Sequence, residues 1–283
     1  GLGVDKESGT FTLGTATSVD GQLDLLGGTL DNSGTNVTLS DGATIRRATG
    51  SLSATPSFGT SVNVEYLGDT DVSTGNELPD PSSGTSVGRL TVRGTGTVSL
   101  TKAVTVAEAL ALENGTLNNG ASNVTVASGA EVELSGGSLS EAPIYDGLVQ
   151  LTYQGAGALS TGVELPDEAD RIIVNVPDGL TLSKNVGIAD QLVIQKGTMN
   201  LDGFTVTLDG SAVLDEQPGA VVSGDAGQIQ ATRTLNAPSG ANMGGLGFTI
   251  TSSANLGMTT VIRTHNRPFD GDDVAAARVY DVQ

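Results

Sequence analysis

The sequence predicts an all-β chain wound as a right-handed parallel β-helix, a solenoid, with a C-terminal segment that caps it or begins a β-sandwich. Three observations support this fold class. The chain repeats itself at a fixed offset, its apolar residues come in short alternating triplets, and its 283 residues include 40 Gly but no Trp and no Cys. Internal repeats are typical of solenoids, in which each structural unit stacks on the next.

The repeat is clearest around Tyr66 and Tyr153, which lie 87 positions apart. Each is followed by the same Ser-Thr-Gly-x-Glu-Leu-Pro-Asp run, at residues 73–80 and 160–167. The repeat comprises one partial copy and two full copies, at residues 10–50, 62–147 and 148–224. After the Leu-Pro-Asp corner the offset falls to 82. The five extra residues lie in the Ser-, Gly- and Pro-rich run 81–89, so we expect a surface loop there.

Within each copy the strands are expected to be short. Apolar-polar-apolar triplets alternate with period two, which predicts β-strands; they stand at residues 90–92, 98–100, 104–106, 110–112, 124–126 and 132–134. Gly, Asn, Asp and Ser between them suit turns. Comparable triplets return about every 20 residues, a repeat length typical of solenoid coils. We therefore expect coils of three short strands and three corners, four coils to a module and roughly ten or more in all.

Composition favours the solenoid over its main alternative, tandem immunoglobulin-like β-sandwiches of about 85 residues each. Sandwich strands are longer, and their cores usually hold a buried Trp or several aromatics, whereas aromatic residues make up 3% of this chain. A narrow core of stacked Val, Leu, Ile and Ala fits the composition better. The right-handed winding is expected from the general preference of parallel crossovers.

Beyond about residue 226 the pattern changes to longer alternations, at residues 228–233, 246–251, 259–265 and 277–282. We therefore expect residues 1–225 to form the solenoid and residues 226–283 to form a strand-rich cap or the start of a β-sandwich. A solenoid needs such a cap because an open last coil presents a strand edge that aggregates.

The chain has 32 acidic and 13 basic residues, for a formal net charge of −19. This charge argues against nucleic acid as a partner, since nucleic acid needs a basic surface. No apolar run is long enough for a membrane span, so membrane insertion is not expected. The acidity suits either a protein of a high-salt habitat or an ordinary secreted bacterial protein. The chain starts without Met and stops in mid-pattern, which suggests a mature or excised piece of something longer.

Candidate residues for metal binding and catalysis are few. Asp270, Asp272 and Asp273 surround a Gly and are candidate ligands for Ca²⁺, which prefers oxygen donors. The full EF-hand spacing is missing, and a solvated acidic turn explains them more simply. His265 is the only histidine, and no recognisable nucleophile or orienting acid accompanies it. We expect it to be a surface residue.

A polysaccharide-degrading enzyme is an alternative, because many β-helix proteins are lyases or hydrolases. Such sites need two or three carboxylates, or a basic residue beside carboxylates, on neighbouring coils. Glu131 and Glu133 are two residues apart in the sequence. The equivalent positions of the next copy are Val213 and Asp215, so only one of the two carboxylates is repeated. We interpret the two as solvated charges on the outer face. We expect no catalytic and no cofactor-binding residue.

The run from Leu151 to Pro166, with its continuation at residues 180–186 and 192–198, resembles a module of large secreted surface proteins of Gram-negative bacteria. The tail from Gly245 to Val282 is similar to the segment that follows those modules. The resemblance implies an adhesin-like or scaffold protein of modular β-solenoid type, located at the bacterial cell surface and exported with a C-terminal sorting domain.

The sequence therefore favours a structural function, as a stiff stalk or self-assembling filament segment of an extracellular adhesin, with contacts between copies as the expected partnership. The alternative is a module that binds carbohydrate or a surface protein through loops such as residues 81–89. Tyr66 and Tyr153 are repeat-equivalent, so we expect them to be structural and not to stack on sugars.

Overall fold

The computed structural model describes residues 1–120, 123–224, 226–266 and 277–283. The described residues form β-strands and a single short 3-10 helix, η1 (Pro81–Ser83). About 11 turns of parallel β-solenoid are distributed over two compact units, Gly1–Val149 and Gln150–Gln283. The predicted solenoid is therefore confirmed. Parallel pairing excludes tandem immunoglobulin-like sandwiches, whose sheets are antiparallel.

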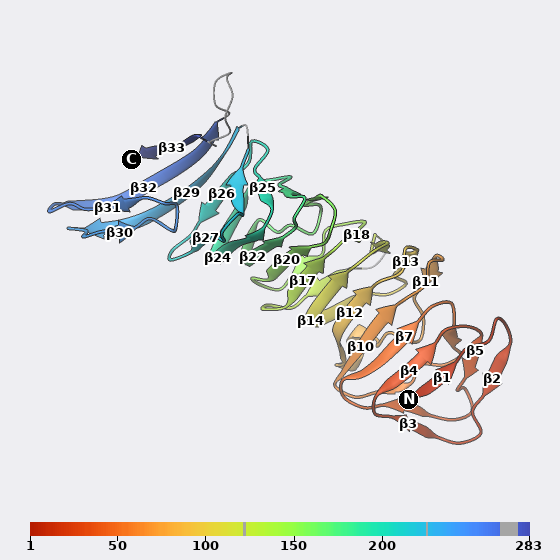
Figure 1. Ribbon diagram of the computed structural model, residues 1–283. Coiled ribbons are helices and arrows are strands. Elements are labelled where there is room, and N and C mark those ends of the chain that lie inside the picture. Colours follow the sequence, from red (N-terminus) through yellow and green to blue (C-terminus); the bar gives the residue numbers. More distant parts are fainter. Residues whose placement is uncertain (121–122, 225, 267–276) are drawn as a thin grey trace. The chain divides into compact units, whose positions relative to one another are not determined.

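In the first unit, each coil contributes one strand to a long parallel sheet, the main sheet of that unit (Figure 1). In order of stacking, its strands are β1 (Leu2–Val4), β4 (Gln22–Leu25), β7 (Ala43–Arg47), β10 (Ser61–Tyr66), β12 (Ser86–Val92), β14 (Val104–Leu112) and β17 (Glu131–Leu134). The first part of β14 also pairs with β16 (Val124–Val126), which in turn pairs with β19 (Ile144–Tyr145).

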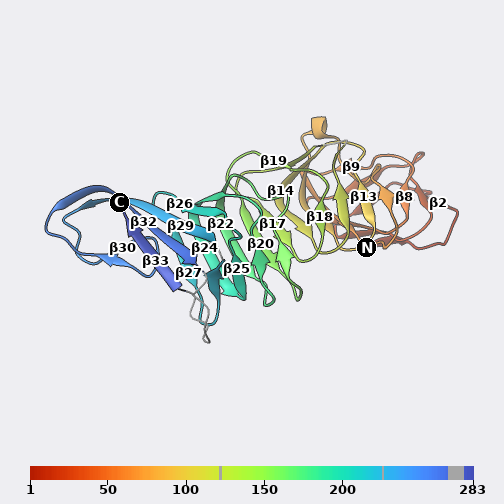
Figure 2. The same cartoon turned by 90° about the horizontal axis from the view of Figure 1, so that it is seen from above.

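The other sides of these coils form shorter parallel sheets, which Figure 2 shows from above. One contains β2 (Thr10–Thr12), β5 (Thr29–Asp31) and β8 (Ser51–Leu52), and another contains β3 (Thr17–Val19), β6 (Val37–Leu39) and β9 (Ser57–Phe58). The third contains β11 (Val72–Ser73), β13 (Thr97–Ser99), β15 (Thr116–Asn118) and β18 (Ser138–Leu139).

Strand register shows how far the chain advances in each coil. Successive register partners in the first unit are Val4, Leu25, Arg47, Tyr66, Val92, Leu112 and Leu134. In the second unit they are Tyr153, Val174, Ile194 and Glu216. The expected spacing of the triplets is therefore confirmed as the length of one coil, and the coil from Tyr66 to Val92 is the longest of those in register.

This longest coil has five more positions than its repeat-equivalent, the coil from Tyr153 to Val174. The extra length forms the predicted surface loop, which contains η1. Asp80 caps η1 by accepting a hydrogen bond from the Ser82 amide at 2.8 Å, and Gly84 ends it with φ 78°. Directly after the loop, β12 shifts register by one residue against both β10 and β14, and from Leu90 to Val92 it is again paired residue by residue. The insertion therefore changes one corner and leaves the coils stacked.

The second unit has its own main sheet of β20 (Gln150–Gln154), β22 (Glu168–Asn175), β24 (Val186–Lys196), β26 (Thr205–Leu208), β27 (Val213–Glu216) and β29 (Ala226–Asn236). A short parallel sheet holds β21 (Leu159–Ser160), β23 (Leu180–Thr181), β25 (Thr198–Asn200) and β28 (Val221–Ser223).

Strand direction changes on β29, which is parallel to β26 on one side and antiparallel to β32 (Asn255–Asn266) on the other. β32 pairs antiparallel with β33 (Ala277–Val282), and β30 (Ala241–Asn242) pairs antiparallel with β31 (Thr249–Ile250). Arg263 on β32 is fully buried and donates two hydrogen bonds of 3.0 Å to the carboxylate of Glu216 on β27. This ion pair fastens the antiparallel strands to the last coils.

The core of the first unit is a column of aliphatic side chains in register. Its members are Leu23, Ile45, Val64, Leu90, Leu110 and Val132, each at most 1% exposed. Burying an aliphatic side chain of this size contributes about 1.5–3 kcal/mol. Because each residue stacks on one of similar size in the next coil, a narrow core forms without large aromatics.

Glycine is required where the chain leaves the main sheet and the coils approach closely. A Cβ on Gly94 would lie 1.8 Å from the carbonyl oxygen of Gly68, and one on Gly115 would lie 2.4 Å from that of Gly94. Both distances are far below van der Waals contact, so a side chain there would push the coils apart.

Candidate functional site

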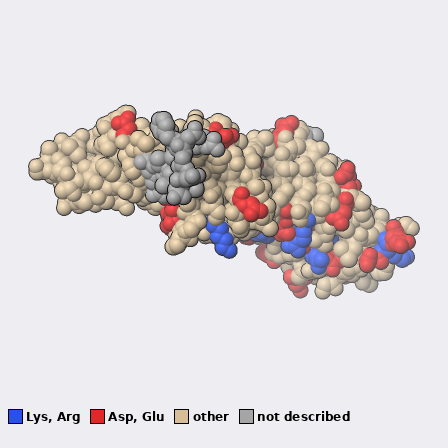
Figure 3. Space-filling view, turned by 45° about the horizontal axis from the view of Figure 1, so that its top comes forward, with Lys and Arg blue, Asp and Glu red and all other residues tan. Residues whose placement is uncertain are grey.

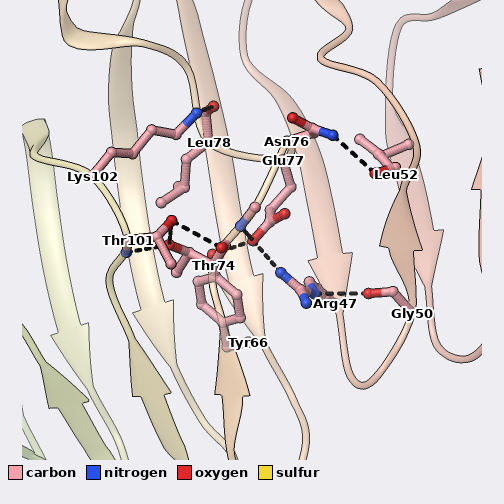
Figure 4. Close-up of polar contacts among 11 residues, drawn as sticks. Arg47, Gly50, Leu52, Tyr66, Thr74, Asn76, Glu77, Leu78, Thr101 and Lys102 are labelled. Carbon is pink, nitrogen blue, oxygen red and sulfur yellow. Dashed lines mark hydrogen bonds and ion pairs between the residues drawn. The ribbon is translucent and has the colours of Figure 1, made fainter. Parts of the chain in front are cut away.

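The repeated Ser-Thr-Gly-x-Glu-Leu-Pro run places a carboxylate inside the first unit. Glu77 is fully buried and accepts hydrogen bonds from the Tyr66 hydroxyl and the Gly75 amide, both at 2.9 Å (Figure 4). Arg47 pairs with the same oxygen of Glu77, and its Nε donates to the Gly50 carbonyl at 2.7 Å. We call this set the buried corner.

The environment of the buried corner fixes the protonation of its tyrosine. Burial and the adjacent Glu77 carboxylate raise the pKa of Tyr66 well above its ordinary value, while Arg47 opposes the shift. Tyr66 therefore stays a neutral hydrogen-bond donor at physiological pH. Because Tyr66 and Glu77 are shielded from solvent, the buried corner is suited to holding coils together and not to reacting with a substrate.

The buried corner recurs in the second unit, where the Tyr153 hydroxyl donates to Glu164 at 2.9 Å and the Gly162 amide donates to it at 2.8 Å. The position equivalent to Arg47 is Leu134 in the sequence. The expectation that Tyr66 and Tyr153 are structural is confirmed, since both are at most 1% exposed.

A second polar contact recurs beside each corner. The Thr101 amide donates to the Thr74 hydroxyl at 3.0 Å, as seen in Figure 4, and the Ser183 amide donates to the Thr161 hydroxyl at 2.8 Å. In both places a hydroxyl on one coil satisfies a backbone group on the next. The sequence repeat is thus a repeat of inter-coil hydrogen bonds.

Charged residues on the outer surface of the first unit pair with one another; we call their set the ion-pair face. Arg93 bridges Glu65 at 2.9 Å and Glu113 at 2.8 Å, and Arg89 binds Glu133 through two bonds of 2.8 and 2.7 Å. The hydrogen bond to Glu133 raises the pKa of Arg89. Arg46 extends the set by lying 3.3 Å from Glu65.

The ion-pair face offers little room for a ligand. Its pocket, beside Arg89, Thr91 and Arg93, has a volume of about 180 Å³, below the roughly 300–1,000 Å³ of typical ligand sites. On the surface drawn in Figure 3, basic side chains mostly lie beside acidic ones. Each of the three arginines of the ion-pair face has a carboxylate partner, so the set carries no excess of positive charge.

A larger cavity, the polar groove, lies within the second unit on the outer surface of β22, β24, β26 and β29. Its volume is about 670 Å³, within the range of ligand sites. Its walls carry carboxylates, amides and hydroxyls, among them Asp167, Glu168, Asn185, Thr207, Asp209 and Gln230. Strand register places Glu168 opposite Gly187, Gly187 opposite Thr207 and Thr207 opposite Gln230.

The groove has least side-chain bulk at Gly187, which lies beside two carboxylate residues. A Cβ placed on Gly187 would lie 3.0 Å from Asp209 Oδ2 and 3.3 Å from Glu168 Cγ. Both acidic side chains therefore lie close against the Gly187 backbone, and a side chain at this position would crowd them. On one wall, the Lys184 ammonium lies 2.7 Å from Asp167 and lowers the pKa of that carboxyl.

The structure places the sequence-derived candidates apart from this groove. Glu131 and Glu133 are half-buried on β17, and Glu133 is held by Arg89 rather than freely solvated. Val213 is exposed, and Asp215 accepts a hydrogen bond from Gln217 at 2.8 Å. None of these residues lines the polar groove.

The remaining candidates concern the C-terminal segment. The expectation of a surface histidine is wrong, because His265 is 2% exposed. It lies on β32 opposite Gly227 of β29. Because glycine has no side chain, Gly227 leaves room for the His265 ring. Asp270, Asp272 and Asp273, the candidate Ca²⁺ ligands, lie outside the described residues. Within the described ranges, no group of three acidic, histidine or cysteine residues is arranged to hold a metal ion.

Sequence reasoning missed the polar groove. Its residues come from strands of successive coils and from positions next to those strands, and only Asp167, the last residue of the run at 160–167, belongs to a repeated motif. The signal was present in the register: Glu168, Gly187, Thr207 and Gln230 occupy the same row of the stack.

Comparisons of the chain with protein-family models, with curated proteins and with solved structures gave no match. In the part of the chain that the structure describes, no helix has the length and apolar character needed to cross a membrane.

Proposed function

We propose that this chain is a structural segment of a bacterial cell-surface protein, a stiff spacer that holds other parts of that protein at a fixed distance from the cell. The observation that carries the proposal is the stacking itself. Within each unit, parallel hydrogen bonds join each coil to its neighbours, and the buried corner adds a polar clamp at the repeat-equivalent coil.

Stiffness is the physical property that the proposal needs. A coil stacked on its neighbours cannot bend independently, because tilting it would break several ladder hydrogen bonds and open the aliphatic column. A flexible chain of about 87 residues would instead have a root-mean-square span of about 50 Å with a broad distribution. The resemblance to modules of secreted surface proteins supports an extracellular location. Contacts between copies are a second use that we propose for the stack.

The spacer proposal can be tested by distance measurements inside the first unit. Thr10 and Ser138 are exposed and lie six coils apart on equivalent rows of the short sheets. At about 4.8 Å per coil, spin labels there should report a narrow distribution near about 29 Å. Deleting residues 93–112, one complete coil, should shorten the distance by about 5 Å without broadening it.

A broad distribution in the parent protein, or a deletion that leaves the mean distance unchanged, would refute the stiff-spacer proposal. Labelling intact source cells with an antibody against the chain tests the location separately. Antibody binding that requires prior permeabilisation would contradict a cell-surface location.

A catalytic function has weaker support. Glu168 and Asp209 are close enough for a pair of glycosidase carboxylates, whose separation is about 5–10 Å. The general acid of a glycosidase, however, has its pKa raised by apolar surroundings, whereas both carboxylates here are exposed in an open polar groove. We therefore do not propose hydrolysis.

A further inference from the structure

The chain has three methionines, and the structure places them in opposite environments. Met199 and Met243 are both 0% exposed, whereas Met258 on β32 is 78% exposed, the largest value for any large apolar side chain among the described residues. A thioether is a polarizable group that hydroperoxides oxidise to a sulfoxide. Access of the sulfur to solvent therefore decides which methionine reacts first.

The exposure of Met258 follows from the alternation of side chains along β32. Thr259 and Val261 are buried on one face of the strand, so Met258 lies on the opposite, outer face together with Thr260. Strand register places Met258 opposite Thr234 of β29, which is exposed as well. The Met258 side chain therefore contributes little to the packing of the antiparallel strands.

The other two methionines are enclosed by the fold. Met199 lies in register between Leu180 and Val222 of the short sheet, and both neighbours are at most 1% exposed. Met243 lies in the turn between β30 and β31, where its amide donates to the Phe248 carbonyl at 3.3 Å. An oxidant reaches either sulfur only when the surrounding structure opens, which a stable packed region does less than about 1% of the time.

The surroundings of Met258 suit the oxidised side chain as well as the reduced one. Oxidation makes the side chain polar by adding an acceptor oxygen to the sulfur. On the outer face the neighbouring side chains are hydroxyls, which can donate: Thr234 lies opposite, and Thr260 shares a hydrogen bond of 2.8 Å with Thr232. A sulfoxide here would join a polar surface and would not enter the core.

We propose that Met258 is a reversible oxidation site, at which a hydroperoxide converts an exposed apolar side chain into a polar one without disturbing the fold. The step breaks the O–O bond of the hydroperoxide and forms an S=O bond; the sulfur loses two electrons, and the hydroperoxide is reduced to water or an alcohol. A methionine sulfoxide reductase reverses the change by oxidising a dithiol to a disulfide, and the sulfoxide oxygen leaves as water.

The test is a time course of the full chain in dilute hydrogen peroxide, quenched with free methionine and followed by peptide-mapping mass spectrometry. Met258 should react at a rate close to that of N-acetylmethionine amide in the same solution, and Met199 and Met243 at least about 100-fold more slowly. In concentrated urea all three should react alike. Met258→Leu should remove the fast phase, whereas Met199→Leu, the matched change in the core, should keep it. If Met199→Leu fails to fold by circular dichroism, the site-resolved rates of the parent still decide the question.

Equal rates for the three methionines in the folded chain would overturn the proposal, and so would a faster reaction at Met199 or Met243. Chain oxidised at Met258 should keep the urea midpoint of the parent; a lower midpoint would show that this side chain supports the fold. Because the sulfur faces solvent, both sulfoxide epimers should form, so a reductase specific for one epimer should restore only part of the methionine. Complete restoration by one reductase would contradict an open site. None of these outcomes bears on the spacer proposal, which depends on coil distances in the first unit.

Discussion

Replacing Tyr66 with Phe removes a single hydroxyl from the interior of the first unit and preserves the shape of the ring. That hydroxyl donates to Glu77 at 2.9 Å, and Glu77 is fully buried. Hydrogen bonds to charged groups contribute about 1.5–3 kcal/mol, and a buried acceptor that loses a donor cannot replace it with water. Arg47 and the Gly75 amide remain as partners, so we expect the lower half of that range.

Native-state hydrogen exchange measured by mass spectrometry suits this prediction, because a stack of repeats loses stability locally as well as globally. Tyr66→Phe should lower the opening free energy of amides in β10 and β12 by about 1.5–2 kcal/mol. Tyr153→Phe is the matched change in the second unit and should affect β20 and β22 in the same way. The two share no partners, so the double variant should be additive within about 0.5 kcal/mol.

The reasoning would be refuted if Tyr66→Phe left protection in β10 within about 0.5 kcal/mol of the parent, the range of ordinary surface substitutions. The Tyr66–Glu77 bond would then contribute nothing that water or a rearranged Arg47 could not supply.

Three other predictions concern the pKa of Tyr66, the loop that contains η1, and the Arg263–Glu216 ion pair. Because the pKa of Tyr66 is raised in the folded chain, the unfolded chain releases a proton above about pH 10 that the folded chain retains. The free energy of unfolding should therefore fall as the pH rises beyond about 10. Urea midpoints at pH 9 and 11 should show this fall, and Tyr66→Phe should reduce it. Deleting residues 81–85 makes Ser86 follow Asp80 directly, as Glu168 follows Asp167 in the second unit. The urea midpoint should stay close to that of the parent. Loss of the fold would contradict our account of the longest coil. Arg263→Met removes the buried Arg263 partner of Glu216 and should lower the free energy of unfolding by about 3–5 kcal/mol. Amide exchange in β29 and β32 should become faster. Unchanged exchange would show that the ion pair does not fasten the antiparallel strands to the last coils.

Much of the fold could be predicted because its determinants are local and periodic. The triplets at residues 90–92, 110–112 and 132–134 are successive partners in the main sheet, as their spacing indicated. The fall of the repeat offset after the Leu-Pro-Asp corner located the loop that contains η1. A solenoid allows this because neighbours in space are neighbours in the repeat.

The candidate site could not be predicted in the same way. The Tyr66–Glu77 bond depends on the chain turning inward after Gly75, which sequence spacing does not show. The polar groove depends on side chains of four coils facing one row. The burial of His265 depends on an antiparallel pairing with β29, whereas the repeat informs only about parallel neighbours. In each case the deciding fact is a three-dimensional register that no single segment contains.

The close approach of Gly68, Gly94 and Gly115 carries a consequence for tolerance to mutation. A methyl group on Gly94 would push its coil away from the coil of Gly68 at this corner only. In the aliphatic column the two coils would keep their spacing. All coils after Gly94 would then tilt together, so a local increase in coil spacing would change the direction of the solenoid axis. In such an architecture a substitution can redirect everything downstream while leaving each coil individually well formed.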